Sequence, residues 1–275
     1  MTLPDTDRII LYRYPQQRAR RSLSAGPWKT RFALNYKGIP YRTQWVEYPD
    51  IAPLLSALGV KPNPSSSSGP IPVPAYTLPA IYDPRTQRTI MDSYQIAIYL
   101  DETYPETPAI LPPETRVFQT AFQHALGNVL HYKVVPVFLH QVSKALNPRS
   151  REYFIETREG FMGRTLEDLS PPPGSAEHAE RWADIEKAFG VVTSWIESAG
   201  DGRLLLGGGG PDGENGKVTH ADTDLAGLLV MTRLVFGADS QEWKLIEGFN
   251  GGRWKRYDAY FKFERVFEGQ TAATT

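Results

Sequence analysis

The sequence predicts an α/β domain over residues 1–104, a linker over 105–115 and an all-helical domain over 116–275. Three observations predict this fold class. Short β-favouring runs alternate with helical segments in the first part, whereas the last part holds only long amphipathic segments. The stretch between them is rich in Pro, Glu and Thr, which is typical of a domain junction. A length of 275 residues also fits two domains of ordinary size.

The first part alternates strand and helix. Ile9–Tyr12 is a short apolar run that predicts a buried strand, and a helix follows from about Gly26-Pro27 to Gly38. The later segments are predicted in turn as a strand, a short helix, a proline-rich loop, two strands and a helix. They are Tyr41–Tyr48, Ile51–Leu58, Lys61–Pro74, Tyr76–Tyr82, Arg88–Met91 and the segment from Asp92. The resulting order is β-α-β-α-β-β-α.

The second part is predicted to be helical throughout. Asn147-Pro148, a run of prolines at 171–173 and Gly200 separate its amphipathic segments. The expected helices are 116–146, 149–169, 176–199, 219–236 and about 253–267. Thr219 and Asp222 have the spacing of a helix capping box.

Composition excludes several function classes. The chain carries 30 basic and 31 acidic residues, which argues against a nucleic-acid or membrane-surface partner. Cysteine is absent, so disulfides, thiolate metal sites and a cysteine nucleophile are excluded. The histidines lack metal-binding spacing, and no apolar run is long enough to span a bilayer. The first residues lack a signal-peptide core, and we expect a cytoplasmic protein that binds no metal.

Ser24 immediately precedes the first helix. A hydroxyl at a helix N-terminus can donate a hydrogen bond to a thiolate, which the helix dipole also stabilises. An ordinary capping or loop serine is the alternative.

Pro79 interrupts a strand-forming segment. It indicates either an edge strand with a trans bond or a cis Leu78–Pro79 bond. The cis form would turn the Leu78 backbone outward, where it could pair with an extended peptide.

Asp92-Ser93 begins the third helix of the α/β domain. With Gln95, Asp92 fits a capping box. Alternatively, Ser93 and the helix N-terminus hold a carboxylate while Asp92 accepts from an ammonium group, an arrangement that suits an α-amino acid.

Together these three motifs outline a site for a thiol-containing peptide, and the strand order is thioredoxin-like. The sequence resembles the glutathione transferases through 28–42, 45–51 and 76–81. These runs are similar to the fungal etherase-related class (fungal class A), itself similar to bacterial lignin β-etherases. Thr219–Asp222 resembles the family's capping box, although Thr223 replaces the usual bulky apolar residue.

The resemblance implies a serine-type glutathione transferase in which Ser24 is catalytic and glutathione is the co-substrate. It also implies that glutathione is bound by Leu78, Pro79, Asp92 and Ser93. The acceptors would be hydrophobic aromatic electrophiles or peroxides, and the protein a homodimer.

Pro15, Phe122 and Leu126 are expected from family geometry to lie at the acceptor site. A basic run, Arg18, Arg20 and Arg21, could add positive potential beside Ser24 or simply be a solvated loop. A mainly non-catalytic ligandin for polyphenols and glutathione-dependent β-aryl-ether cleavage are the alternative functions.

Overall fold

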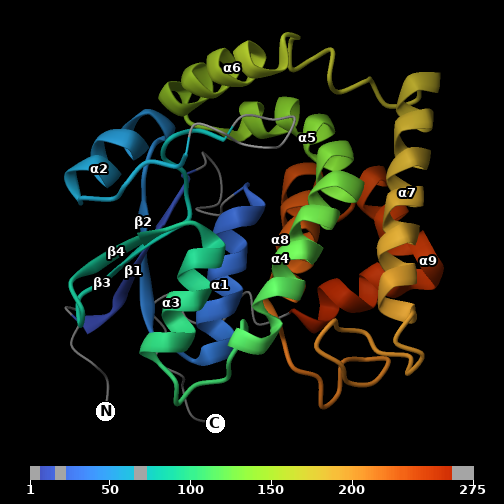
Figure 1. The fold of residues 1–275 in the computed structure, drawn as a ribbon. Coiled ribbons are helices and arrows are strands. Elements are labelled where there is room, and N and C mark those ends of the chain that lie inside the picture. The colour runs from blue at the N-terminus through green and yellow to red at the C-terminus, as the bar shows by residue number, and fades with distance from the viewer. Residues whose placement is uncertain (1–6, 16–22, 65–72, 262–275) are drawn as a thin grey trace.

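The computed structural model describes residues 7–15, 23–64 and 73–261 and confirms the α/β domain followed by helices (Figure 1). The strands of its sheet are β1 (Ile9–Arg13), β2 (Tyr41–Trp45), β3 (Ala80–Asp83) and β4 (Arg88–Met91). Their order is β2-β1-β3-β4. β1 and β2 are parallel, whereas β3 is antiparallel to both β1 and β4. A parallel βαβ unit followed by an antiparallel hairpin is the thioredoxin-like arrangement that the sequence predicts.

Helices cover this sheet. They are α1 (Ala25–Lys37), α2 (Ile51–Ala57), which follows the short 3₁₀ turn η2 (Tyr48–Asp50), and α3 (Ser93–Thr103). Figure 1 shows α1 and α3 between the sheet and the helices of the second part. Leu11, Leu34, Ile81 and Leu100 are fully buried in the core that the sheet shares with α1 and α3. Apolar residues on one face of each element form this core, as the periodicity indicates.

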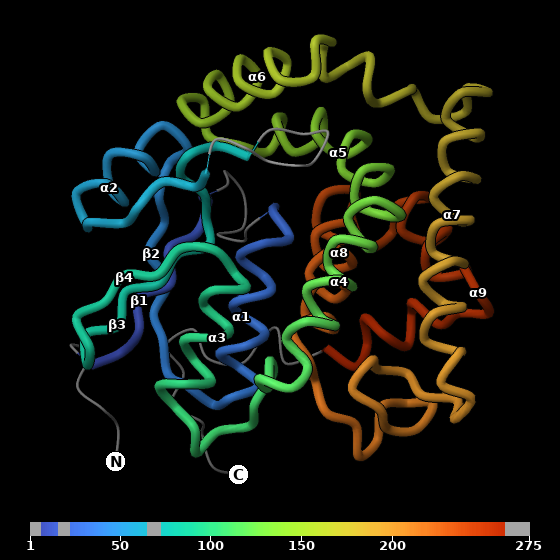
Figure 2. Tube along the Cα trace, viewed as in Figure 1, coloured from blue at the N-terminus to red at the C-terminus, as the bar shows by residue number. Residues whose placement is uncertain are grey.

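The second part is helical in the residues that the structure describes. Its elements are η3 (Pro113–Thr115), α4 (Arg116–Leu126), the π-helical turn η4 (Gly127–His131), α5 (Tyr132–Ala145), α6 (Pro148–Met162), α7 (Ala176–Glu197), α8 (His220–Phe236) and α9 (Gln241–Tyr260). Figure 2 traces α8 between α1 and the outer helices. A Cβ atom at Gly227 would lie 2.8 Å from the Ala25 carbonyl oxygen, so this glycine lets α8 approach the start of α1.

Several predicted boundaries were wrong. The expected helix 116–146 is divided by η4. This division was not predicted, because a π-helical turn leaves the apolar pattern intact on both sides of it. The expected helix 149–169 ends at Met162, where Gly163 adopts the left-handed conformation. The helix expected at about 253–267 does start there, after the non-helical residues Phe249–Gly252, but the helical segment that begins at Gln241 before this interruption was not predicted; residues 262–267 lie outside the described part.

Two local features agree with predictions made from the sequence. The Leu78–Pro79 peptide bond is cis, and β3 begins only after Pro79. The capping box at the start of α8 is also present, with reciprocal bonds between Thr219 and Asp222. Thr223 is fully buried, and its hydroxyl donates to the His220 carbonyl at 2.7 Å.

Candidate functional site

Ser24 is the N-cap residue of α1, which begins at Ala25, one position before the predicted start at Gly26. Its backbone is extended, and its side chain makes no capping hydrogen bond. The half-buried serine lines a cavity of about 280 Å³. Its hydroxyl is therefore not used by the helix, and it lies where the N–H groups of the first turn favour an anion.

A glycine allows the start of α1 to approach the cis proline. A Cβ atom at Gly26 would lie 3.1 Å from the Pro79 Cδ and 3.3 Å from the Leu78 carbonyl oxygen. Gly26 follows Ser24 by two residues and lines the same cavity. The structure therefore brings two of the predicted motifs, Ser24 and Leu78–Pro79, to one place.

The backbone groups of Leu78 meet the side chain of Tyr14, which directly follows β1. The Tyr14 hydroxyl accepts from the Leu78 N–H at 3.1 Å and donates to the Leu78 carbonyl at 3.3 Å. Burial raises the pKa of Tyr14, so the hydroxyl keeps its proton at neutral pH. This contact was not predicted, because 64 residues separate the partners along the chain.

Asp92 caps α3, as one of the two sequence interpretations predicts. Its Oδ1 atom accepts from the backbone N–H groups of Tyr94 at 2.9 Å and Gln95 at 3.0 Å. Its own N–H donates to the Pro79 carbonyl at 3.2 Å, which ties the cap to the cis proline. The Asp92 Oδ2 atom accepts no hydrogen bond from the described residues. Capping by one oxygen thus leaves the other available for a ligand.

The cavity beside Ser24 has an aromatic wall contributed by both parts of the chain. Tyr14 stacks on Tyr48, with ring centroids 4.3 Å apart, and Phe154 meets Tyr48 edge-on at 5.3 Å. Arg158, one turn beyond Phe154 on α6, also lines the cavity. The Tyr48 N–H donates to the Ser150 Oγ at 2.9 Å and so holds α6 against η2. Sequence reasoning missed this wall, since its members are distant in the chain.

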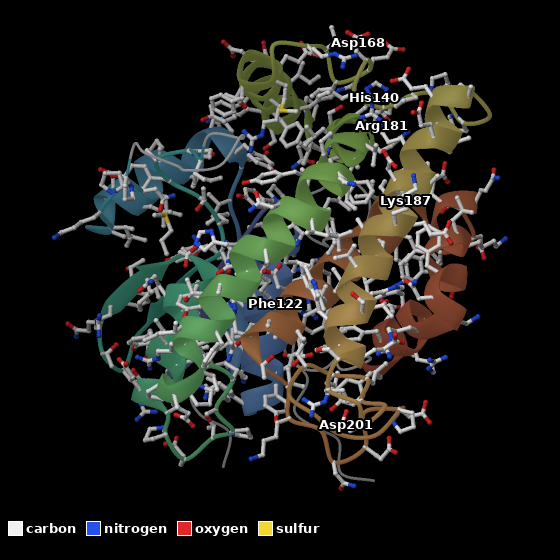
Figure 3. The ribbon with its side chains drawn as sticks, turned by 45° about the vertical axis from the view of Figure 1, so that its right-hand side comes forward. Phe122, His140, Asp168, Arg181, Lys187 and Asp201 are labelled. Atoms are coloured by element: carbon white, nitrogen blue, oxygen red, sulfur yellow. The ribbon has the colours of Figure 1, made fainter. Side chains whose placement is uncertain are left out.

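The predicted acceptor residues lie in different surroundings. Pro15 follows Tyr14 and is partly buried. Figure 3 labels Phe122 on α4, and its ring lies 5.8 Å from that of Trp195 on α7. Leu126 is fully buried in the helical core. None of these three is among the described residues that line the cavity beside Ser24. Arg18, Arg20 and Arg21 lie outside the described residues.

A buried charge cluster joins α1, η4 and α8 behind the cavity. The Lys29 Nζ lies 2.7 Å from the Asp224 Oδ1, and the His131 Nε2 lies 3.4 Å from the same oxygen. Burial alone would raise the pKa of Asp224, but Lys29 and His131 outweigh it, so the pKa is lowered. Burial also lowers the pKa of His131, which lines the cavity. These charges hold the first turns of α1 against α8.

His220 should make the protein less stable in mild acid. Burial, reinforced by Lys29, lowers its pKa to about 4, against about 6.5 in an unfolded chain. Between these values only the unfolded state takes up the proton, so the free energy of unfolding falls as the pH drops, by at most about 1.4 kcal/mol per unit.

Urea denaturation at pH 7, 6 and 5 measures this loss. We expect His220→Gln to make the pH dependence shallower, whereas the exposed His124→Gln should preserve it. An unchanged slope in His220→Gln would contradict this origin of the acid sensitivity.

Two other kinds of site were sought in the described ranges 7–15, 23–64 and 73–261. They contain no cluster of three or more His, Cys, Asp or Glu residues suited to a metal ion. None of the helices there is both long and apolar enough to cross a membrane.

Comparison with known proteins assigns both parts of the chain. Residues 24–103 match the glutathione S-transferase N-terminal domain, and residues 117–263 match the C-terminal domain. The glutathione S-transferase-like protein ustS of Aspergillus flavus is 32% identical over 244 residues, which are 86% of this chain and 82% of that protein.

Solved structures of fungal glutathione transferases support the same family assignment. A glutathione S-transferase of Ceriporiopsis subvermispora, crystallised with glutathione, has a TM-score of 0.85 and 40% identity, covering 95% of this chain and 99% of its own. A glutathione transferase of Phanerochaete chrysosporium has a TM-score of 0.82 and 35% identity, covering 94% and 97%. With matches along nearly its whole length, the chain belongs to the glutathione S-transferase family.

Proposed function

We propose that the protein transfers the thiolate of glutathione to hydrophobic aromatic electrophiles or peroxides, with Ser24 as the catalytic residue. The observation that supports this most strongly is the uncommitted Ser24 hydroxyl, which lies at the start of α1 on the edge of a cavity. Family membership and the glutathione bound in the Ceriporiopsis relative support the choice of thiol.

Glutathione would lie along the backbone of Leu78. Its cysteinyl residue would take over the N–H and C=O groups that the Tyr14 hydroxyl now occupies. Its γ-glutamyl ammonium would meet the Asp92 Oδ2. The Ser93 hydroxyl and the N-terminus of α3 would hold its carboxylate. This arrangement directs the sulfur atom toward Ser24 and the cavity.

The Ser24 hydroxyl would activate the thiol by stabilising its anion. A free thiol has a pKa near 8.5, so only a small fraction is ionised at neutral pH. A hydrogen bond to the thiolate and the N-terminus of α1 together supply on the order of 2.7 kcal/mol, which lowers the pKa by about two units. The serine keeps its own proton, and the thiol proton goes to solvent. The thiolate then forms a bond to the electrophilic carbon of the acceptor, and the leaving group, a halide ion in an aryl halide, departs to solvent. With a peroxide the O–O bond breaks, the alcohol leaves, and a second glutathione converts the oxidised sulfur to glutathione disulfide.

Calorimetry tests the placement of glutathione. We expect Asp92→Ala combined with Ser93→Ala to weaken glutathione binding roughly 10-fold or more, since both charged ends of the γ-glutamyl group lose a partner. Asp92→Asn removes the charge but retains an oxygen that can cap α3. Comparing it with Asp92→Ala therefore separates the effect of the charge from the effect of the cap. Wild-type affinity in the double variant, with the fold intact by circular dichroism, would refute this clamp.

A ligandin function is the second candidate, because the cavity is bordered mainly by apolar and aromatic side chains. Glutathione-dependent β-aryl-ether cleavage, the activity suggested by the resemblance to the etherase-related class, is the third candidate. Turnover of 1-chloro-2,4-dinitrobenzene and of a lignin-model ether, measured in parallel with thermal shifts caused by phenolic ligands, separates the three. Large shifts without turnover would favour the ligandin.

We further propose a homodimer in the cytoplasm, with the domain boundary at residues 105–115. The dimer rests on the resemblance, and the location is the one expected from the sequence. Sedimentation velocity of the purified chain and microscopy of a tagged version test them.

A further inference from the structure

Arg158 brings a positive charge to a cavity with mostly apolar walls. It lies on α6, and its guanidinium carbon is 4.7 Å from the centre of the Phe154 ring and 5.4 Å from that of Tyr48. All three residues line the cavity beside Ser24. The guanidinium is therefore held on the aromatic wall by cation–π contacts.

The guanidinium has no carboxylate partner in the described part of the chain. Its Nη1 donates to the neutral Thr157 Oγ1 at 2.9 Å, which leaves most of the five guanidinium donors available to a ligand. By contrast, Arg149 on the same helix pairs with Asp50 at 2.5 Å. A cation that lines an apolar cavity and lacks an internal counter-ion is suited to an anionic ligand.

We propose that the acceptor pocket selects small aromatic compounds that carry an anionic group, which Arg158 binds while their rings lie against Tyr48 and Phe154. This deepens the proposed function by naming the substrate class, and it rests on that function. A volume of about 280 Å³ is near the lower end of ligand pockets, which favours small ring systems. The anionic group at Arg158 would leave the electrophilic atom free to face Ser24 on the same cavity.

Glutathione itself offers three competing anions: the γ-glutamyl carboxylate, the glycyl carboxylate and the thiolate. Its γ-glutamyl carboxylate would be held at the start of α3, and neither Asp92 nor Ser93 lines this cavity. Its thiolate would lie beside Ser24, on the same cavity as Arg158, and its glycyl carboxylate is the remaining anion that could pair with the guanidinium. The experiment must therefore separate an effect on the acceptor from an effect on glutathione.

A matched pair of ligands tests the proposal. 2-Naphthoate and 2-naphthamide share their shape and differ in charge, and calorimetry measures both without any need for turnover. Wild type should bind the carboxylate roughly 10-fold more tightly than the amide. Arg158→Gln should remove that preference, and Arg158→Lys should restore part of it because the charge returns without the bidentate geometry. Arg151→Gln, an exposed position on the same helix, should behave as wild type.

Three outcomes would overturn the proposal: equal affinity of wild type for the two ligands, equal weakening of both in Arg158→Gln, or displacement of naphthoate by glutathione. Calorimetry with glutathione on the same variants shows whether the anion preference or the proposed glutathione-dependent function has failed. A protein that prefers naphthoate to naphthamide but does not bind glutathione would refute the proposed function and leave the role of Arg158 intact. If Arg158→Gln weakens glutathione binding instead, the guanidinium serves the peptide and the proposal is wrong.

Discussion

Replacing Ser24 with alanine is expected to lower kcat/KM for an aryl halide roughly 10- to 100-fold, because the variant loses a hydrogen bond to a charged sulfur. The same loss should raise the pKa of the bound thiol by one unit or more, toward the value near 8.5 of the free thiol. Thiolate absorbance of bound glutathione, titrated against pH, measures this shift even if turnover is slow. At about pH 5, well below the lowered thiol pKa, the bound thiol is mostly neutral in both proteins, and glutathione affinity should change little.

Two variants serve as controls for this result. Ser24→Thr retains a hydroxyl and should keep much of the activity, whereas Ser194→Ala removes an exposed serine from α7 and should have no effect. A thiol pKa in Ser24→Ala equal to that of wild type would mean that another group, or the helix N-terminus alone, stabilises the anion. Ser24 would then lose its catalytic role.

Asp222→Ala should cause a large loss of stability. The buried carboxylate accepts from the Thr219 N–H at 2.8 Å, the Thr219 hydroxyl at 2.6 Å, the Leu206 N–H at 2.7 Å and the Tyr257 hydroxyl at 2.7 Å. Alanine leaves these donors without an acceptor in the interior. We expect the free energy of unfolding to fall by about 3–5 kcal/mol.

Urea denaturation monitored by circular dichroism measures this loss. Asp184→Ala on α7 is the matched control, since that side chain is half exposed and its removal should change stability by about 0.5 kcal/mol or less. An equal, small effect of both substitutions would mean that the capping box contributes little to the fold. The pKa of Asp222 is raised by burial, which is consistent with the cost of keeping this carboxyl group ionised in the interior.

Sequence reasoning succeeded where the determinant is local. The strand Ile9–Arg13 and the helices that begin at Ser93 and His220 follow from apolar periodicity and from capping residues near their starts. Pro79 restricted its strand to two backbone forms, and the structure has one of them. In each case the signal and the feature lie within a few residues of each other.

Sequence reasoning failed where a feature depends on residues that are far apart in the chain. The aromatic wall of the cavity requires Tyr48 and Phe154 to meet, and the charge cluster requires Lys29 to meet Asp224. Neither pairing has a periodic signature. Leu126 was expected at the acceptor site, yet it is fully buried in the helical core, because an apolar helix position gives no indication of whether it faces a cavity or another helix.

A crystal structure with bound glutathione tests the central claim most directly. We expect the cysteinyl backbone to pair with the N–H and C=O groups of Leu78, the Tyr14 hydroxyl to have left both, and the sulfur to lie within hydrogen-bond reach of the Ser24 Oγ. A tripeptide bound elsewhere while both Tyr14–Leu78 hydrogen bonds persist, or a sulfur directed away from Ser24, would contradict the account.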